Sequence, residues 1–194
     1  MRKLIVTEFV SLDGVMEDPG GAEKATFDRG GWAFQFERGE DGDRFKFEEL
    51  MDADAMLLGR VTYEGFAKAW PSMTDDVGFA DKMNGIAKYV ISGTLTSADW
   101  NATTILGGHA ADEIAKLKAT DGGTILVAGS AQLVHTLTEH DLVDEYRLMV
   151  FPLVIGAGKR VFDDPGEPRA LRLIEANAVG SDGVMTFRYE PKRG

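Results

Sequence analysis

The chain has 194 residues, 44% of them hydrophobic, which is enough for one well-buried core and short for two. Acidic residues outnumber basic ones by 32 to 21, and the net charge of -11 disfavours nucleic acid and anionic membranes as partners. There is no cysteine, Glu8 ends the N-terminal apolar run before a signal peptide is complete, and no run reaches membrane-spanning length. We therefore expect one cytoplasmic domain, residues 1–194, that acts on a small molecule.

The N-terminal stretch, residues 3–10, is β-branched and alternating, which predicts a strand that leads into a turn. Residues 17–42 are rich in glycine but also contain Trp32, Phe34 and Phe36. Such a segment is too aromatic for a disordered linker. It is expected to be either a lid over a pocket or a surface loop that tucks its aromatic rings into the core.

Residues 43–51 show helical spacing, and the apolar run at 55–58 predicts a strand. Gly59 follows this run, and a second helix is expected directly after it. A glycine between a strand and a helix lets a ligand approach the unpaired N–H groups at the start of the helix. Arg60 and Thr62 would bring a guanidinium and a hydroxyl to a phosphate there, although an arginine in this position can also be simply solvated.

The same pattern recurs at residues 124–128, where Gly129 separates an apolar strand from a helix. Gly129 is expected either to let a phosphate lie against the helix N-terminus or merely to turn the strand into the helix. Between the two junctions, the sequence predicts strands at 88–94 and 103–106 and a helix at 110–119.

The C-terminal part is rich in β-forming residues. A strand is expected over 145–155, and strands at 171–178 and 184–189 flank an Asp-Gly pair that is typical of a hairpin. Strands alternate with helices until this end of the chain. The order predicts an α/β protein with a largely parallel sheet and an antiparallel edge.

Several common catalytic motifs are missing. The three histidines form no metal-binding motif, Ser130 lacks the Gly-x-Ser-x-Gly context of a nucleophile, and residues 156–160 lack the length and hydroxyl of a P-loop. Neither glycine junction matches the Rossmann fingerprint. We expect no metal site and no serine hydrolase.

Ordered motifs nevertheless span most of the chain: Ser11–Gly14, Leu57–Glu64, Tyr89–Ser92, Leu126–Ser130, Leu142–Glu145 and Pro152–Gly158. Together they resemble the dihydrofolate reductase-like superfamily, especially the branch related to the C-terminal reductase domain of the bifunctional riboflavin-biosynthesis deaminase-reductase. The resemblance implies a three-layer α/β/α fold and a mixed, mostly parallel sheet with an antiparallel C-terminal hairpin. It also implies NADPH as the hydride donor and a homodimer.

By position, the resemblance assigns cofactor contacts to the two glycine junctions and to the end of the strand at 88–94. These residues are Gly59, Arg60, Val61, Thr62, Ser92, Gly93, Gly129, Ser130, Ala131, Gln132 and Leu133. It assigns substrate contacts to Thr7, Asp13 and Phe47.

The sequence also departs from the family pattern. Riboflavin reductases usually carry a lysine where Thr7 falls, an acidic residue where Val127 falls, and an Asp-x-Pro-x-Leu-x-x-Arg segment that is absent here. Dihydrofolate reductases place a carboxylate on the helix before the Gly-Arg motif, and Asp43 falls there, with Phe47 one turn later. Asp43 is therefore the candidate catalytic acid, although it can equally be a carboxylate that favours the helix start.

The sequence thus predicts an NADPH-dependent reductase of a pyrimidine- or pterin-like heterocycle. In such an enzyme the cofactor carries the chemistry, and the protein supplies position and exclusion of water. The missing substrate-binding charges suggest an alternative from another class, a dimeric nucleotide-binding protein without catalytic turnover.

Overall fold

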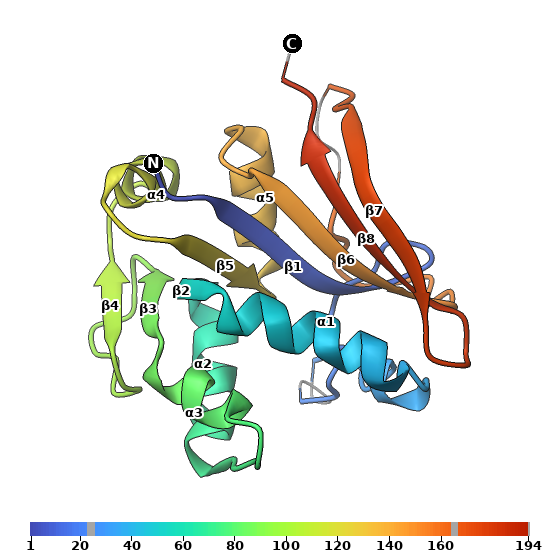
Figure 1. Cartoon of the computed structure of the whole chain (residues 1–194). Helices are drawn as coiled ribbons and strands as arrows, with labels where there is room; N and C mark the ends of the chain where they lie inside the picture. The colour runs from blue at the N-terminus through green and yellow to red at the C-terminus, as the bar shows by residue number, and fades with distance from the viewer. Residues whose placement is uncertain (23–25, 164–166, 194) are drawn as a thin grey trace.

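The structure is a computed structural model, and it describes residues 1–22, 26–163 and 167–193. Figure 1 shows a twisted sheet that runs through the molecule, with helices packed against it. The strands are β1 (Leu4–Ser11), β2 (Ala53–Gly59), β3 (Ala87–Ile91), β4 (Thr103–Leu106), β5 (Thr124–Ala128), β6 (Glu145–Phe151), β7 (Leu171–Val179) and β8 (Val184–Pro191). The helices are α1 (Gly39–Met51), α2 (Arg60–Ala69), α3 (Phe79–Gly85), α4 (Ala110–Ala119) and α5 (Ala131–Glu139), with 3-10 turns at Ala33–Gln35 and Trp70–Ser72.

The strands form one sheet in the order β4-β3-β2-β5-β1-β6-β8-β7. All neighbours from β4 to β6 pair in parallel, whereas β8 pairs antiparallel with both β6 and β7. The predicted parallel sheet with an antiparallel C-terminal hairpin is confirmed. Parallel strands end at the same edge, so β1, β2 and β5 bring their carboxyl ends together, where open α/β sheets bind ligands.

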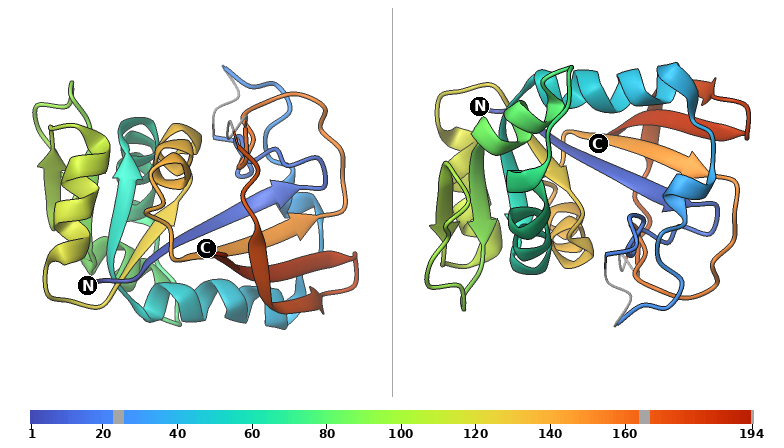
Figure 2. Two further views of the ribbon diagram at one scale, coloured as in Figure 1. Left: turned by 90° about the horizontal axis from the view of Figure 1, so that it is seen from above. Right: turned by 90° about the horizontal axis from the view of Figure 1, so that it is seen from below.

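Helices cover both faces of the sheet, which confirms the predicted three layers. Figure 2 shows α1 and α3 on one face and α4 and α5 on the other. Leu50 of α1 and Met83 of α3 pack on one side of the sheet, and Ile114 of α4 and Leu137 of α5 pack on the other. Residues 4–6 of β1 are buried because this central strand is covered on both faces. None of the helices in the described ranges is long and apolar enough to cross a membrane.

Several predicted elements have other bounds in the structure; the strand expected at 88–94, for example, ends at Ile91. The strand expected over 145–155 stops at Phe151, because the next residue is a proline and cannot donate a ladder hydrogen bond. The helix expected from Asp43 begins earlier, at Gly39. Gly39 and Gly42 are poor helix formers, and they hid this first turn from the hydrophobic pattern.

The aromatic segment before α1 divides between the core and the surface. Trp32 is 2% exposed, packs edge-on against Phe151 with ring centroids 5.5 Å apart, and donates its indole N–H to the Glu17 carbonyl at 3.0 Å. Phe34, by contrast, is 68% exposed. Trp32 therefore fits the interpretation of a loop tucked into the core, whereas Phe34 remains on the surface.

A buried carboxylate organises the cations where β6 meets the hairpin. Glu145 is 0% exposed, and its oxygens accept hydrogen bonds from Lys3 at 2.5 Å and from Arg147 and Arg188 at 2.8 Å each. Arg147 and Arg188 are direct partners across β6 and β8, so Glu145 offsets their mutual repulsion. Burial alone would raise the pKa of Glu145, but the hydrogen bonds from Arg188, Lys3 and Arg147 outweigh it and hold the pKa at about 2.

We expect Glu145→Gln to lower the free energy of unfolding by about 2 kcal/mol at pH 7, because it leaves three cations around a buried neutral amide. Glu175→Gln is the matched control, since Glu175 pairs with the same Arg188 but is exposed, and it should cost less than about 0.5 kcal/mol.

The pH dependence of this effect follows from the lowered pKa. A depressed carboxyl pKa stabilises the folded state above the unfolded value and loses this effect as the pH falls toward about 2. Denaturant titrations of wild type and Glu145→Gln should therefore converge as the pH falls from 5 to about 2. A constant difference between the two proteins across this range would contradict the assignment.

Candidate functional site

Two strand-to-helix junctions meet at the carboxyl edge of the sheet. The Gly59 N–H donates to the Ser130 hydroxyl at 2.9 Å, and that hydroxyl donates to the Thr62 hydroxyl at 2.7 Å. Gly129 and Ser130 have φ values of +65° and +67°, in the left-handed region that favours glycine. These contacts hold the first turns of α2 and α5 beside each other.

Gly129 has no room for a side chain. An added Cβ would lie 2.8 Å from Thr62 Cγ2 and 3.1 Å from Thr62 Oγ1. A Cβ at Gly59 would lie 3.1 Å from Ser130 Oγ. The junction itself therefore requires Gly129, as the structural interpretation of the sequence proposed, whether or not a phosphate also lies against it.

The N-termini of α2 and α5 converge at these glycines. The first N–H groups of a helix have no partner within that helix, and they carry the positive end of its dipole. The predicted cofactor residues at these two ends are Arg60, Val61 and Thr62 in α2 and Ala131, Gln132 and Leu133 in α5. The side chains of Ala131 and Leu133 are buried, so these two residues can contact a ligand only through their backbone N–H groups. The pair of helix ends fits an anionic group such as a pyrophosphate.

Ser92 and Gly93, the other predicted cofactor residues, follow β3, which lies next to β2. The Ser92 hydroxyl accepts hydrogen bonds from the N–H groups of Thr94 at 3.1 Å and Leu95 at 2.9 Å, so it already stabilises its own turn. A Cβ on Gly93 would meet nothing within 4 Å. Arg60, which directly follows the neighbouring strand β2, is exposed and pairs with Glu64 one helical turn later at 2.9 Å. A ligand phosphate at Arg60 therefore competes with Glu64.

On the other side of β1, three polar side chains form a cluster that we call the α1 cluster: Thr7, Lys46 and Glu49. The Thr7 hydroxyl lies 2.7 and 2.9 Å from the two oxygens of Glu49, and the Lys46 ammonium donates to Thr7 at 2.6 Å. Lys46 also pairs with Glu49 and lies 5.0 Å from the centroid of the Phe9 ring. Thr7 and Glu49 are buried, so Lys46 is the member that reaches toward solvent.

Asp43 bonds to Arg38 rather than to a member of this cluster, although Arg38 and Lys46 both lie over the Phe9 ring. Its carboxylate is exposed and accepts a hydrogen bond from Arg38 at 2.6 Å. Phe47, the predicted substrate contact one turn later, is partly buried. The structure thus brings Thr7 together with Lys46 and Glu49 rather than with Asp43, and the role predicted for Asp43 remains a prediction.

Asp13, the other predicted substrate contact, joins two loops. Its carboxylate accepts hydrogen bonds from the Ser11 hydroxyl at 2.7 Å and from the N–H groups of Ile155 at 3.0 Å and Gly156 at 2.8 Å. The Ser11 hydrogen bond, aided by those from Ile155 and Gly156, lowers the pKa of Asp13 to about 2. Asp13 therefore ties the turn after β1 to the segment after β6.

A further carboxyl group reaches the glycine junction from β1. Glu8 is 5% exposed, and its Oε2 accepts a hydrogen bond from the Gly129 N–H at 3.0 Å. Burial raises the pKa of Glu8 to about 8, against the lowering effect of the Gly129 N–H. The side chains of adjacent residues in a strand point to opposite faces, so Glu8 and Thr7 belong to different layers.

Sequence reasoning missed Glu8, Lys46 and Glu49. A charge between apolar neighbours in a strand covered on both faces was the available signal for Glu8. Lys46 and Glu49 have the (i, i+3) spacing of a helix ion pair, but nothing in the sequence shows which face of α1 meets β1.

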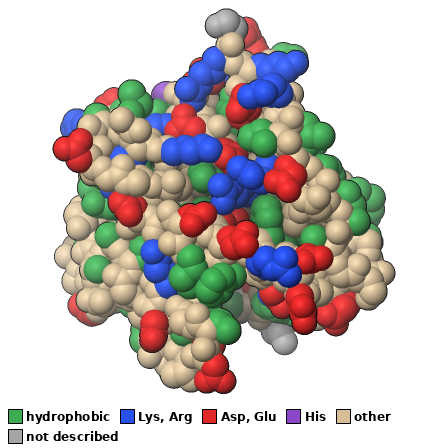
Figure 3. All heavy atoms as spheres, in the orientation of Figure 1, with side chains coloured by type: hydrophobic (Ala, Val, Ile, Leu, Met, Phe, Trp, Pro, Cys, Tyr) green, Lys and Arg blue, Asp and Glu red, His purple; other side chains and the backbone are tan. Residues whose placement is uncertain are grey.

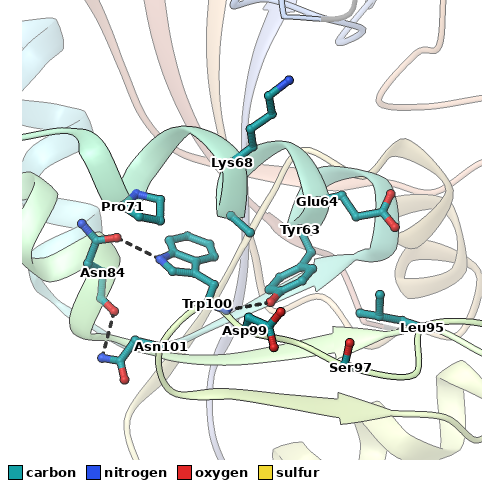
Figure 4. Close-up of a pocket in the computed structure, with 11 residues that line it drawn as sticks. Tyr63, Glu64, Lys68, Pro71, Asn84, Leu95, Ser97, Asp99, Trp100 and Asn101 are labelled. Atoms are coloured by element: carbon teal, nitrogen blue, oxygen red, sulfur yellow. Dashed lines mark hydrogen bonds between the residues drawn. The ribbon is translucent and has the colours of Figure 1, made fainter.

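A separate hollow lies between α2 and the loop before β4, and Figure 4 shows the residues that line it. Its polar groups bind one another: Asn84 accepts from the Trp100 indole at 2.8 Å and from Asn101 at 3.3 Å, and the Trp100 N–H donates to the Tyr63 hydroxyl at 3.2 Å. None of the residues predicted to bind cofactor or substrate lines it. We assign it no ligand.

The face that carries α1 has no patch of a single charge. Figure 3 shows lysine and arginine side chains near its centre with acidic side chains interspersed among them. Within residues 1–22, 26–163 and 167–193, no group of three or more histidine or acidic side chains is placed to hold a metal ion.

The strand order and the paired glycine junctions define a dihydrofolate reductase-like α/β protein. More specifically, the profile of the RibD C-terminal domain matches residues 2–185, and the chain belongs to this family. Two proteins of Bacillus subtilis (strain 168) are similar over nearly their whole length. The uncharacterized protein YwjB is 31% identical over 179 residues, covering 92% of this chain and 93% of that protein. The uncharacterized protein YyaP is 28% identical over 191 residues, covering 97% and 94%.

Three solved structures share the fold. A putative riboflavin biosynthesis protein from Shewanella sp. PV-4 superposes with a TM-score of 0.76 at 21% identity, covering 98% of this chain and 99% of that one. Dihydrofolate reductase from Enterococcus faecalis, complexed with NADP(H) and RAB-propyl, gives 0.59 at 12% identity, covering 98% and 97%. A Thermotoga maritima diaminohydroxyphosphoribosylaminopyrimidine deaminase/5-amino-6-(5-phosphoribosylamino)uracil reductase gives 0.62 at 17% identity, where the match covers 98% of this chain and 57% of that one.

We expect Gly129→Ala to lower the free energy of unfolding by about 2 kcal/mol, because the Cβ meets Thr62 and alanine disfavours the positive φ. Thr62→Ser removes the nearest atom, so the cost of Gly129→Ala should fall by about half in that background. Gly65→Ala is the control within α2, since nothing lies within 4 Å of its Cβ, and it should stabilise by about 0.5 kcal/mol. Equal costs of Gly129→Ala in both backgrounds would show that Thr62 is not the constraint.

Proposed function

We propose that the protein is an NADPH-dependent reductase of a pyrimidine- or pterin-like heterocycle. The convergence of two helix N-termini on the Gly59–Ser130–Thr62 contact carries this proposal, because it forms an anion-binding cradle at the ligand-binding edge of the sheet. Membership of the RibD C-terminal domain family and the dihydrofolate reductase-like fold support a reductase-type function.

Such a cofactor would supply the hydride, and the residues of this chain would hold the reactants and keep water away. The backbone N–H groups of α2 and α5 would bind its phosphates. Lys46 compensates for one departure from the family pattern. Its ammonium donates to the Thr7 hydroxyl and so brings a positive charge from α1 to the place where the riboflavin reductases carry a strand lysine. Lys46 would orient a carbonyl or phosphate oxygen of the heterocycle.

We include a homodimer in the proposal. β7 lies at the edge of the sheet, and Leu173 and Ile174 on it are 51% and 43% exposed. A long edge strand with exposed apolar residues favours association with a second chain. Light scattering of the purified protein tests this part, and a monomer at micromolar concentration would contradict it.

Titration of the purified protein with NADPH and NADH, followed by a screen for loss of NADPH absorbance with dihydrofolate and aminopyrimidine substrates, tests the proposed activity. Binding with turnover supports a reductase. Binding without turnover on any of these heterocycles supports the alternative, a dimeric nucleotide-binding protein without catalysis. Failure to bind either dinucleotide would overturn both.

We expect NADPH to bind more tightly than NADH, because NADPH carries an additional phosphate and Arg60 is an exposed cation beside the cradle that could bind it. Arg60→Gln should weaken NADPH binding at least about tenfold and leave NADH binding within about threefold. Glu64→Gln should strengthen NADPH binding about threefold, since it removes the internal competitor for Arg60. Lys68→Gln in the last turn of α2 is the charge-matched control. Equal calorimetric affinities of wild type for the two dinucleotides would contradict the assignment.

We expect Lys46→Met to lower kcat/KM about 100-fold, because the substrate loses the one cation of the α1 cluster. Asp43→Asn tests the catalytic role predicted for Asp43 separately: a loss of kcat/KM of about tenfold or more would support that role, and activity within about threefold of wild type would contradict it. Since Lys46→Met leaves Glu49 buried without its ion pair, the double variant Lys46→Met/Glu49→Gln and thermal unfolding curves serve as controls for stability. Loss of activity in Asp43→Asn with retention in Lys46→Met would contradict the role proposed for Lys46 and support the role predicted for Asp43.

A further inference from the structure

Glu8 is a buried acid that no step of the proposed reaction uses. Its Oε2 holds the Gly129 N–H at 3.0 Å, and its Oε1 is buried with no hydrogen-bond partner among the described residues. A buried ionised carboxylate is stable only when both oxygens are well paired, whereas a neutral carboxylic acid tolerates this environment. The geometry therefore favours the neutral form.

The surroundings of Glu8 agree with this protonation state. Val6 and Val10, two residues away on either side along β1, belong to the same apolar core, and Leu148 is its partner on β6. The charged groups that act on it are Lys46 and Glu49 of α1, which lower and raise its pKa respectively, and burial is the largest influence. Glu8 is thus neutral at pH 7, with its pKa raised to about 8.

The position of Glu8 makes its protonation state important for anion binding. Its carboxyl group is bonded to the same glycine that joins β5 to the N-terminus of α5, so it lies in the wall of the cradle. A carboxylate there would repel a pyrophosphate across a poorly screened interior. It would also compete with that anion for the positive ends of the helices. A neutral acid does neither.

We propose that dinucleotide binding is linked to the protonation of Glu8, so that the site accepts an anionic cofactor only while Glu8 is neutral. This inference rests on the proposed function, because it needs a dinucleotide at the two glycine junctions. Glu8 is here a binding residue, and no proton transfer to the substrate is assigned to it.

The test is the dissociation constant of NADPH from pH 7 to 9, a range in which its phosphates do not titrate. Wild-type protein should bind about tenfold more weakly at pH 9 than at pH 7, as expected when only the neutral form of a group with a pKa of about 8 binds. Calorimetry in buffers of different ionisation heat should show uptake of about half a proton per NADPH at pH 8.

Glu8→Gln is the matched variant, because its amide is always neutral and can still accept from Gly129. Whatever its affinity at pH 7, that affinity should change less than about twofold up to pH 9, and binding should show no proton uptake. Glu49→Gln supplies a second test that leaves Glu8 in place. It removes a charge that raises the pKa of Glu8, so the midpoint of the pH dependence should move to lower pH.

The outcomes separate the two proposals. A wild-type affinity that does not change from pH 7 to 9 overturns the linkage and leaves the proposed function intact. An equal loss of affinity in wild type and Glu8→Gln also overturns it, and assigns the titration to another group such as Lys88, whose burial lowers its pKa to about 8. Folded protein that binds no NADPH at pH 7 overturns the proposed function, and the linkage with it.

Discussion

The close approach of the two strand-to-helix junctions is the constraint on which the rest of the site depends. Gly129 faces Thr62 at a distance that leaves no room for a Cβ, and a Cβ at Gly59 would lie tightly against Ser130, 3.1 Å from its Oγ. The Ser130 hydroxyl at the start of α5 then joins the two turns, because it accepts from the Gly59 N–H and donates to the Thr62 hydroxyl at the start of α2. Because the contact is between backbone and short side chains, it fixes the helix ends more rigidly than long side chains would. The cradle is therefore formed before any ligand arrives.

β1 divides the polar groups of the site between two layers. Thr7 points toward α1 and joins Lys46 and Glu49, whereas Glu8 points toward the glycine junction. One layer presents a cation through Lys46, and the other presents a neutral acid. A central strand that is buried on both faces can carry such groups only when each is paired or uncharged. These two adjacent residues thus give the two faces of the sheet different electrostatics.

The fold was predictable because local patterns of hydrophobic residues indicate most of its strands and helices. The change from strand period to helix period at Gly129 located both the carboxyl edge of the sheet and the start of α5. The contact between the junctions was not predictable from periodicity, since Thr62 and Gly129 are far apart in sequence. Asp43 is the candidate catalytic acid because residue count places it where dihydrofolate reductases carry a carboxylate on the helix before the Gly-Arg motif. The two glycines in the first turn of α1 hid where the helix begins and which of its faces meets β1. Glu8 was overlooked because alternation does not distinguish a strand with one buried face from a strand with two.

The central position of the first strand also has a consequence for how the chain folds. β1 is the first strand to be synthesised, yet it pairs with β5 and β6, so that Ile5 lies beside Leu126 and Glu145. It has no sheet partner until β5 is made, about two thirds of the way along the chain, and it lacks its second partner until β6 follows. The hairpin of β7 and β8, by contrast, closes over a short turn. Pairings between residues so distant in sequence slow folding and leave apolar strands exposed for longer. We expect the final collapse of this protein to await β6, and the nascent N-terminal strand to be its most aggregation-prone segment until then.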